Sequence, residues 1–171
     1  MATPTSVAPV DAALIDRVKQ AHRAFPSGVT IVTALVAGRP IGLAVSAFSS
    51  VSMEPPTVLA CVNSSSKSHA DMCDAGHLGI SVLSRTQSGV LAAFARSGGD
   101  KFRDVAWHQG RAETPLIDGA AATFEVQVVS RVEVGTHSVF FGEVTGVETS
   151  GVAPLVYLGG SFFDGDRLAD P

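Results

Sequence analysis

The sequence contains little cysteine and little charge, and this scarcity argues against several protein classes. Two cysteines among 171 residues, Cys61 and Cys73, are too few for a disulfide framework or for a zinc site built from cysteine alone. Cys61 lies in an apolar run, so we expect it to be an inert core residue. Charged residues make up 16% of the chain and the formal net charge is -4, which favours neither a nucleic acid nor an anionic membrane as a partner.

Targeting and membrane signals are also missing from the sequence pattern. Residues 1–10 lack the basic start and the apolar stretch of a signal peptide. No apolar run approaches the roughly 18 residues that a membrane helix needs. Together with the low cysteine content, these observations predict a protein of a reducing compartment, which we expect to be the cytoplasm.

The common motifs of phosphate binding, metal binding and nucleophilic catalysis do not occur. There is no Gly-x-Gly-x-x-Gly after a strand, no Gly-x-x-x-x-Gly-Lys-Ser/Thr, no His-Glu-x-x-His and no Gly-x-Ser-x-Gly. The five histidines are scattered along the chain: His22, His69, His77, His108 and His137. We therefore expect no metal site and no serine nucleophile.

The sequence does contain a dense series of apolar, strand-like runs. Hydrophobic residues make up 46% of the chain, which is enough for a sizeable core and for some apolar surface buried against a partner subunit. Residues 1–9 are expected to be a disordered tail, and residues 10–171 a single domain. Asp11 should cap a helix that ends before Pro26 and carries Leu14, Val18, Ala21 and Phe25 on one face.

Strands and turns dominate the rest of the chain. Residues 37–40 are expected to form a turn, and residues 102–114 an irregular stretch. One short helix should end near Gly76, and a second should run from Ser84 to about Arg96. About seven strands, mostly joined as hairpins, predict a mainly β sandwich or barrel. These strands are expected at residues 29–36, 41–51, 57–62, 78–83, 122–134, 137–148 and 155–157.

Small hydroxyl residues inside apolar runs are the most informative chemical feature. Ser46, Ser49, Ser50 and Ser52 interrupt the second strand, where each hydroxyl either bonds to local backbone or faces a polar ligand. The loop at residues 63–68 supplies further hydroxyls, an ammonium and free N–H groups before a helix. It is either a plain cap-rich loop or an anion cradle, to which Lys101 could add positive charge.

Several short motifs follow one another along the chain. The first two are FPSGVTIVTA at residues 25–34 and GLAVSAFSSVSMEPP at residues 42–56. Shorter ones follow in order: NSSSKSH (63–69), DKF (100–102), GTH (135–137), GEV (142–144), LVY (155–157), Gly160 and FF (162–163). This series resembles that of the short-chain flavin reductases, which belong with the FMN-binding split-barrel proteins, and the resemblance covers nearly the whole chain after residue 9.

This resemblance implies a fold and a set of site residues. The fold would be a split β-barrel of Greek-key type with a few short flanking helices. The flavin would be held by the second strand, by the hydroxyl loop, by Lys101 at the phosphate, and by residues of the first and last motifs. The cofactor-binding residues are then Pro26, Thr30, Val45, Ser46, Ala47, Ser49, Asn63, Ser64, Ser65, Ser66, Ser68, Lys101, Tyr157 and Phe162. His137 would lie beside the nicotinamide, although a histidine exposed at a hairpin end explains the same pattern.

The resemblance also implies an activity. The chain would transfer hydride from NADH or NADPH to FMN, or to FAD, and supply reduced flavin to a separate monooxygenase as a homodimer. Two residues depart from the family pattern: Ala44 stands where threonine is usual, and Thr136 where an acidic residue is common. The alternatives are an FMN carrier or sensor without turnover, and a split-barrel oxidoreductase that uses a deazaflavin or oxidises a pyridoxine phosphate. A haem-handling barrel and a purely structural barrel are further alternatives.

Overall fold

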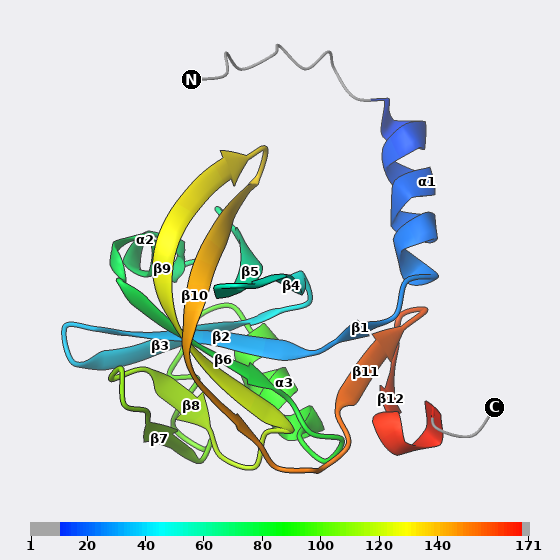
Figure 1. Ribbon diagram of the computed structural model, residues 1–171. Helices are drawn as coiled ribbons and strands as arrows, with labels where there is room; N and C mark the ends of the chain where they lie inside the picture. The colour runs from blue at the N-terminus through cyan, green and yellow to red at the C-terminus, as the bar shows by residue number, and fades with distance from the viewer. Residues whose placement is uncertain (1–10, 169–171) are drawn as a thin grey trace.

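The computed structural model describes residues 11–168, and strands dominate this part of the chain (Figure 1). The expected tail at residues 1–9 lies outside the described residues. The helices are α1 (Ala12–Arg23), α2 (His69–Asp74), α3 (Ser88–Ala95) and a 3-10 turn (Gly165–Leu168). The strands are β1 (Ser27–Gly28), β2 (Thr30–Val36), β3 (Arg39–Val45), β4 (Phe48–Met53), β5 (Pro56–Asn63), β6 (His77–Val82), β7 (Trp107–Gln109), β8 (Pro115–Ile117), β9 (Ala122–Val134), β10 (His137–Thr149), β11 (Leu155–Leu158) and β12 (Ser161–Asp164). The predicted mainly β class is confirmed.

Seven strands form one antiparallel sheet in the order β3-β2-β6-β9-β10-β5-β4. Val45 of β3 and Val62 of β5 belong to the same buried cluster, although other strands separate them in the sheet. The sheet therefore curls around this cluster and leaves a split between its two ends, which confirms the split barrel. A second buried cluster packs α3 beneath the barrel around Phe94, which is 1% exposed.

The prediction of one strand over residues 41–51 is wrong. The strand breaks at Ser46 and Ala47, and its two parts become β3 and β4, the opposite ends of the sheet. A barrel that is split in this way needs a corner where the chain leaves one end of the sheet and joins the other. Hydropathy does not mark the corner, because apolar residues continue on both sides of it.

Three further boundaries differ from the prediction. Helix α3 begins at Ser88 rather than Ser84, because the residues from Ser84 to Gln87 form a turn whose first amide is bonded by the Gln87 side chain (3.0 Å). The stretch expected to be irregular, residues 102–114, contains β7, which pairs with β8 just beyond it, and the Phe162–Phe163 motif lies in β12. These strands of three or four residues are too short to produce a readable periodicity.

The other hairpins follow the sequence closely. The predicted turn between β2 and β3 is present, with φ of 50° at Ala37 and 73° at Gly38, as a tight hairpin turn requires. The long hairpin of β9 and β10 rises from the barrel (Figure 1) and pairs from His137↔Val134 to Thr149↔Ala122. Both of its strands match their predicted ranges to within one residue.

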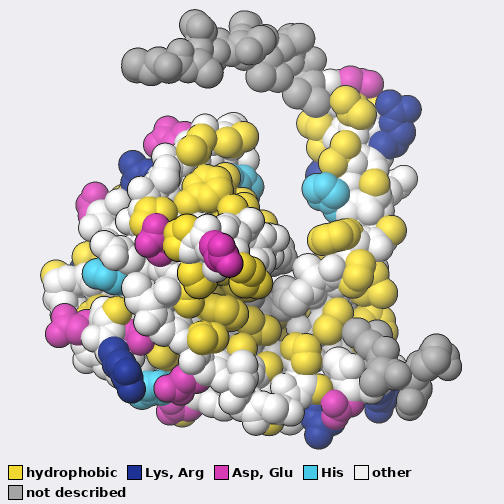
Figure 2. Space-filling view, viewed as in Figure 1, with side chains coloured by type: hydrophobic (Ala, Val, Ile, Leu, Met, Phe, Trp, Pro, Cys, Tyr) yellow, Lys and Arg dark blue, Asp and Glu magenta, His cyan; other side chains and the backbone are white. Residues whose placement is uncertain are grey.

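Helix α1 stands beside the barrel rather than on it. Asp11 caps it as predicted, since its carboxylate accepts the Ala13 N–H at 3.0 Å. None of its residues is buried, and Phe25, just after the helix, is 72% exposed. Figure 2 shows hydrophobic side chains along this helix and on the upper part of the barrel, with open space between the two. The apolar face is present, but nothing else within residues 11–168 covers it. No helix within residues 11–168 is long and apolar enough to cross a membrane.

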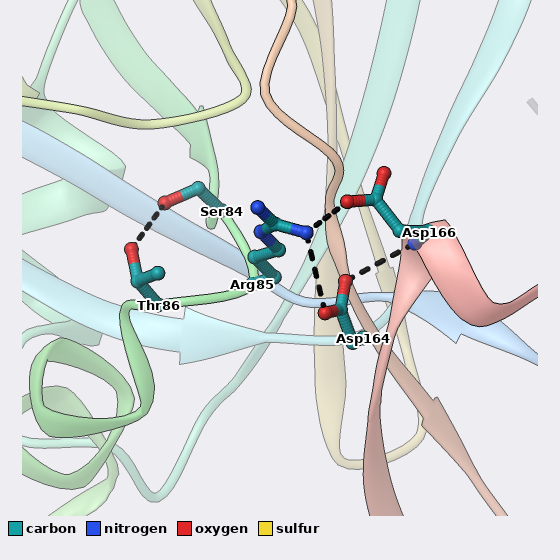
Figure 3. Close-up of polar contacts among 5 residues, drawn as sticks. All are labelled: Ser84, Arg85, Thr86, Asp164 and Asp166. Carbon is teal, nitrogen blue, oxygen red and sulfur yellow. Dashed lines mark hydrogen bonds and ion pairs between the residues drawn. The ribbon is translucent and has the colours of Figure 1, made fainter.

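A small sheet of β1, β11 and β12 joins α1 to the barrel, and an arginine ties it down. Figure 3 shows Arg85 of the turn before α3 reaching two carboxylates at the end of β12. It lies 3.5 Å from Asp164 and also pairs with Asp166, whose own N–H donates to Asp164 at 3.1 Å. Because the group is partly exposed, we expect it to fix the position of this sheet more than to stabilise the fold.

The surroundings of Gly79 in β6 show how closely the barrel is packed. A Cβ there would lie 2.5 Å from the Pro115 carbonyl oxygen and 2.6 Å from Thr33 Oγ1. Thr33 donates to both the Gly79 and the Pro115 carbonyl, so the methyl group would push β6 and β8 apart. We expect Gly79→Ala to lower the free energy of unfolding by about 1–3 kcal/mol in urea titrations.

Gly76 is the matched control, because it stands just before β6 and a Cβ there meets nothing within 4 Å. Gly76→Ala should change the free energy of unfolding by no more than about 0.5 kcal/mol. Equal stability of the two variants would contradict the packing described here.

Candidate functional site

A cavity of about 580 Å³ lies between β3, the loop after β5 and the segment after α3. Gly42, Leu43 and Ala44 form the β3 wall. Residues 63–68, named here the hydroxyl loop, form the second wall with Asn63, Ser65, Ser66, Lys67 and Ser68. Residues 94–102 form the third. The cavity therefore opens at the split of the barrel.

The hydroxyl loop is shaped by its own side chains. Asn63 accepts at Oδ1 from the Ser65 N–H (2.9 Å) and from the Ser65 hydroxyl (2.8 Å). The Ser66 N–H donates to the Asn63 carbonyl at 3.0 Å, and the His69 N–H donates to the Ser66 carbonyl at 3.0 Å. These bonds fold the loop into consecutive turns before α2, so its shape does not depend on a ligand.

Ser64 points away from the cavity. Its N–H and its hydroxyl both donate to the Thr136 carbonyl, at 2.9 and 3.0 Å, on the turn between β9 and β10. Among the serines predicted to bind a cofactor, Ser65, Ser66 and Ser68 line the cavity, whereas Ser64 does not. Composition alone does not separate these serines, because which way each one points is decided by the turns.

Lys101 supplies a fixed positive charge at the cavity wall. Its Nζ donates to the carbonyls of Gly42 and Phe94, each at 3.1 Å, and so ties β3 to the end of α3. Burial lowers the pKa of the Lys101 ammonium below its ordinary value of 10.5. An ammonium has three donors, and two are occupied by these carbonyls. One donor and the whole charge remain for a ligand.

Three other cations line the cavity; sequence reasoning noted the ammonium of Lys67 and missed the two arginines. Arg39, Lys67 and Arg96 line the same cavity, with Asp71 and Asp100 as the acidic residues among its lining. Each of these cations looks like an ordinary charge in a turn or at a helix end. Only the position of Lys67 inside the hydroxyl loop gave a signal. Hydroxyls, backbone turns and an excess of positive charge together suit a phosphate group.

The strand corner adjoins the cavity without lining it. The Thr30 hydroxyl donates to the Val45 carbonyl at 2.6 Å, and the Cys61 N–H donates to the Ala47 carbonyl at 3.0 Å. Ser46 and Ala47 are exposed between these two anchors, and Ser49 follows on the edge strand β4. The prediction that Cys61 is a core residue is wrong: it is half-buried and belongs to neither buried cluster, because alternate residues of β5 point away from the core. Its partial burial still raises the pKa of the thiol.

His137 is the first residue of β10 and lies opposite Asn63 in the β5–β10 pair. It is half-buried, and its Nδ1 lies 3.0 Å from the Thr136 hydroxyl. The pairing places His137 beside the first residue of the hydroxyl loop, so two motifs 74 positions apart in sequence (63 and 137) meet at one place.

The remaining predicted residues lie in and beside the small sheet. Pro26 is exposed before β1, and Tyr157 of β11 faces Phe162 of β12 with ring centroids 5.3 Å apart. None of these three lines the cavity, and Thr30 contacts the site only through the Val45 carbonyl. Within residues 11–168, no three His, Cys, Asp or Glu side chains gather closely enough to hold a metal ion.

Comparisons with known proteins agree with this geometry. Residues 22–166 match the family model described as "Flavin reductase like domain". A "probable flavin reductase" of Rhizobium meliloti (strain 1021) is 42% identical over 152 residues, covering 88% of this chain and 49% of the relative. The reductase component of a 4-nitrophenol 4-monooxygenase/4-nitrocatechol 2-monooxygenase from Rhodococcus opacus is 41% identical over 138 residues, covering 81% of this chain and 74% of the relative.

A solved structure extends the likeness to three dimensions. The NADH:FAD oxidoreductase SgcE6 of Streptomyces globisporus C-1027 superposes with a TM-score of 0.83 at 31% identity, covering 92% of this chain and 96% of that one. The chain spans about half the length of the first of the relatives named above. With a family model that spans most of the described residues and a fold that follows it, this chain belongs to the flavin reductase family.

Proposed function

We propose that this chain is an NAD(P)H:flavin oxidoreductase of the cytoplasm that transfers hydride from NADH or NADPH to FMN or FAD. One observation supports this most: a preformed hydroxyl loop and four cationic side chains face the same cavity in a chain of the flavin reductase family. The flavin, when bound, supplies the hydride acceptor, so the protein must mainly set distance and orientation.

The chain's residues divide into three groups of contacts in this proposal. Asn63, Ser65, Ser66 and Ser68 hold the ribityl chain and the phosphate, with Lys101 as the fixed charge. The exposed corner from Val45 to Ser49 offers main-chain groups to the pyrimidine edge of the flavin, and Thr30 holds that corner in place. Pro26, Tyr157 and Phe162 contribute to the outer wall, and Ser64 acts by anchoring the loop.

The proposal includes a separate flavin-dependent monooxygenase as the consumer of reduced flavin. Its support is the name of the Rhodococcus opacus relative, a reductase component of such an enzyme. The proposal also includes a second copy of this chain as a partner. Leu14, Ile15 and Val18 on α1 are 45%, 41% and 44% exposed, and Val132 and Val134 on the rising part of β9 are 47% and 59% exposed. Figure 2 shows hydrophobic side chains on α1 and on the upper part of the barrel at the open space between the two, where a second copy would bury them.

The first test mixes the purified protein with FMN and NADH and follows the nicotinamide absorbance, then repeats the assay with FAD, riboflavin and NADPH. Oxidation that depends on added flavin would support the reductase and rank both cofactors. Flavin binding without turnover would favour the carrier or the deazaflavin-type alternative. No flavin binding at all would reject the proposal.

His137 is expected to orient the nicotinamide. His137→Ala should lower kcat about tenfold or more while changing the Kd for flavin less than about twofold, because the histidine faces the donor and not the loop contacts. Stopped-flow reduction and flavin fluorescence titration measure the two quantities. His77→Ala, at an exposed position, is the control, and an unchanged rate in His137→Ala would remove this residue from the mechanism.

We expect the affinity for FMN to fall at alkaline pH, because the Lys101 ammonium loses its proton there. The ammonium is the form that binds phosphate, and its pKa lies below 10.5, so FMN affinity should fall as pH rises through that lowered pKa. Riboflavin has no phosphate, so the pH dependence of its affinity shows the effect of the isoalloxazine ring alone. In Lys101→Arg, whose guanidinium stays charged, the FMN-specific loss should disappear. Parallel profiles for FMN and riboflavin in the unaltered protein would contradict a phosphate contact at Lys101.

The exposed apolar face of α1 predicts that the chain forms a dimer. Val18→Glu places a charge on that face and should shift the chain from dimer to monomer in sedimentation velocity. Gln20→Glu adds the same charge on the opposite side of the helix and should leave the dimer intact. A monomer in the unaltered protein, or a dimer that Val18→Glu does not weaken, would reject this interface.

A further inference from the structure

His69 begins α2 immediately after the hydroxyl loop and contacts the strand that carries His137. Its Nε2 lies 2.8 Å from the hydroxyl of Ser138, the residue that follows His137 in β10. His69 is half-buried, and Ser138 is 0% exposed. The contact joins two segments that are separated by 69 positions in the sequence.

The burial of Ser138 makes this contact more than incidental. A hydroxyl away from water costs free energy unless it forms a hydrogen bond. No fully buried side-chain nitrogen or oxygen in the described part of the chain lacks a partner, and His69 is the partner that the structure gives Ser138. The imidazole is therefore held at a fixed point of β10.

A second residue of α2 also contacts the His69 ring. Cys73, one helical turn after His69, has its Sγ 3.6 Å from Nε2 and 3.9 Å from Nδ1. Met72 beside it is fully buried in the barrel core. The helix is thus anchored to the core, and its first side chain reaches across to β10.

A second tie lies on the other side of His137. Ser64 donates twice to the Thr136 carbonyl, so the loop contacts the residue before His137, while His69 contacts the residue after it. Asn63, the first residue of the loop, pairs with His137 itself. The hydroxyl loop is thus connected to Thr136 and His137, and His69, the residue that follows the loop, is connected to Ser138. A shift of the loop changes its distance to His137.

We propose that His69 is a positioning residue that, through Ser138, holds the hydroxyl loop at a fixed distance from His137 and thereby aligns bound flavin with the nicotinamide. The inference depends on the proposed function for its role in turnover, but not for its effect on the loop. His69 touches neither cofactor in this scheme. It acts on geometry, to which hydride transfer is sensitive because the reacting atoms must approach closely.

Hydrogen exchange tests the loop without any cofactor. In protein with no added flavin, His69→Ala should raise the exchange rate of the amides at residues 64–68 about tenfold, since local opening becomes easier when the loop loses a tie. His77→Ala, at the exposed start of β6, is the control and should leave these amides unchanged. Unchanged exchange in His69→Ala would overturn the inference.

Kinetics then test the alignment. His69→Ala and Ser138→Ala should each raise the KM for flavin and lower kcat at saturating flavin, both about tenfold. The double variant should be no worse than either single variant, because both changes remove one bond. His69→Gln, which keeps a side-chain hydrogen-bonding group, should recover both constants to within about threefold of the unaltered chain.

The outcomes separate the two proposals. Additive losses, or a glutamine variant no better than alanine, would show that the bond does not position the loop. An unaltered chain that neither binds nor reduces flavin would reject the proposed function, while faster loop exchange in His69→Ala would still support the structural tie.

Discussion

The corner at Ser46 and Ala47 is the constraint on which the rest of this structure depends. At this point the chain must leave one end of the sheet and join the other, because β3 and β4 are the two edges of the seven-stranded sheet. Two bonds hold the corner. The Thr30 hydroxyl of β2 fixes the Val45 carbonyl, and the Cys61 N–H of β5 fixes the Ala47 carbonyl. The sheet therefore curls around its core and stays open along one line.

That open line creates the cavity. Gly42, Leu43 and Ala44 come from one side of the split, and the hydroxyl loop continues β5, the strand next to the edge strand β4 on the other side. Lys101 reinforces the arrangement, since its bonds to Gly42 and Phe94 bring the loop after α3 against β3. The same ammonium is both a structural tie and the charge offered to a ligand. Removing it would change the shape of the wall as well as its potential, so its two roles are best separated by pH or by arginine.

The sequence predicts the long elements well because their signals are local. The β9–β10 hairpin, the β2–β3 turn and the Asp11 cap depend on periodicity, on turn chemistry and on one side chain next to its own helix. The corner at Ser46 and Ala47 escapes prediction because the barrel imposes it from outside the segment. Strands β7, β8 and β12 were missed because they are too short to show a period.

In the candidate site, too, the sequence indicates local features and misses those that only the fold brings together. Family resemblance named the hydroxyl loop, Lys101 and His137, and the structure places the loop at the cavity and His137 at its first residue. Resemblance does not assign the direction in which each serine points. Ser64 faces the Thr136 carbonyl while Ser65 faces Asn63, a distinction set by turns that no composition encodes. Arg39 and Arg96 were missed because they are far apart in sequence and become neighbours of one cavity only through the fold.

Placement, rather than acid–base chemistry, is what this arrangement supplies. The pKa shifts at Cys61 and Lys101 both arise from burial. The polar groups around the split are instead committed to carbonyls and turns: Thr30 to Val45, Ser64 to Thr136, and Lys101 to Gly42 and Phe94. Each of these bonds fixes a piece of main chain beside the cavity. A reaction whose electrons are carried by a cofactor needs such fixed surfaces more than it needs a base, and a barrel split along one line provides them from strands that its own core already holds rigid.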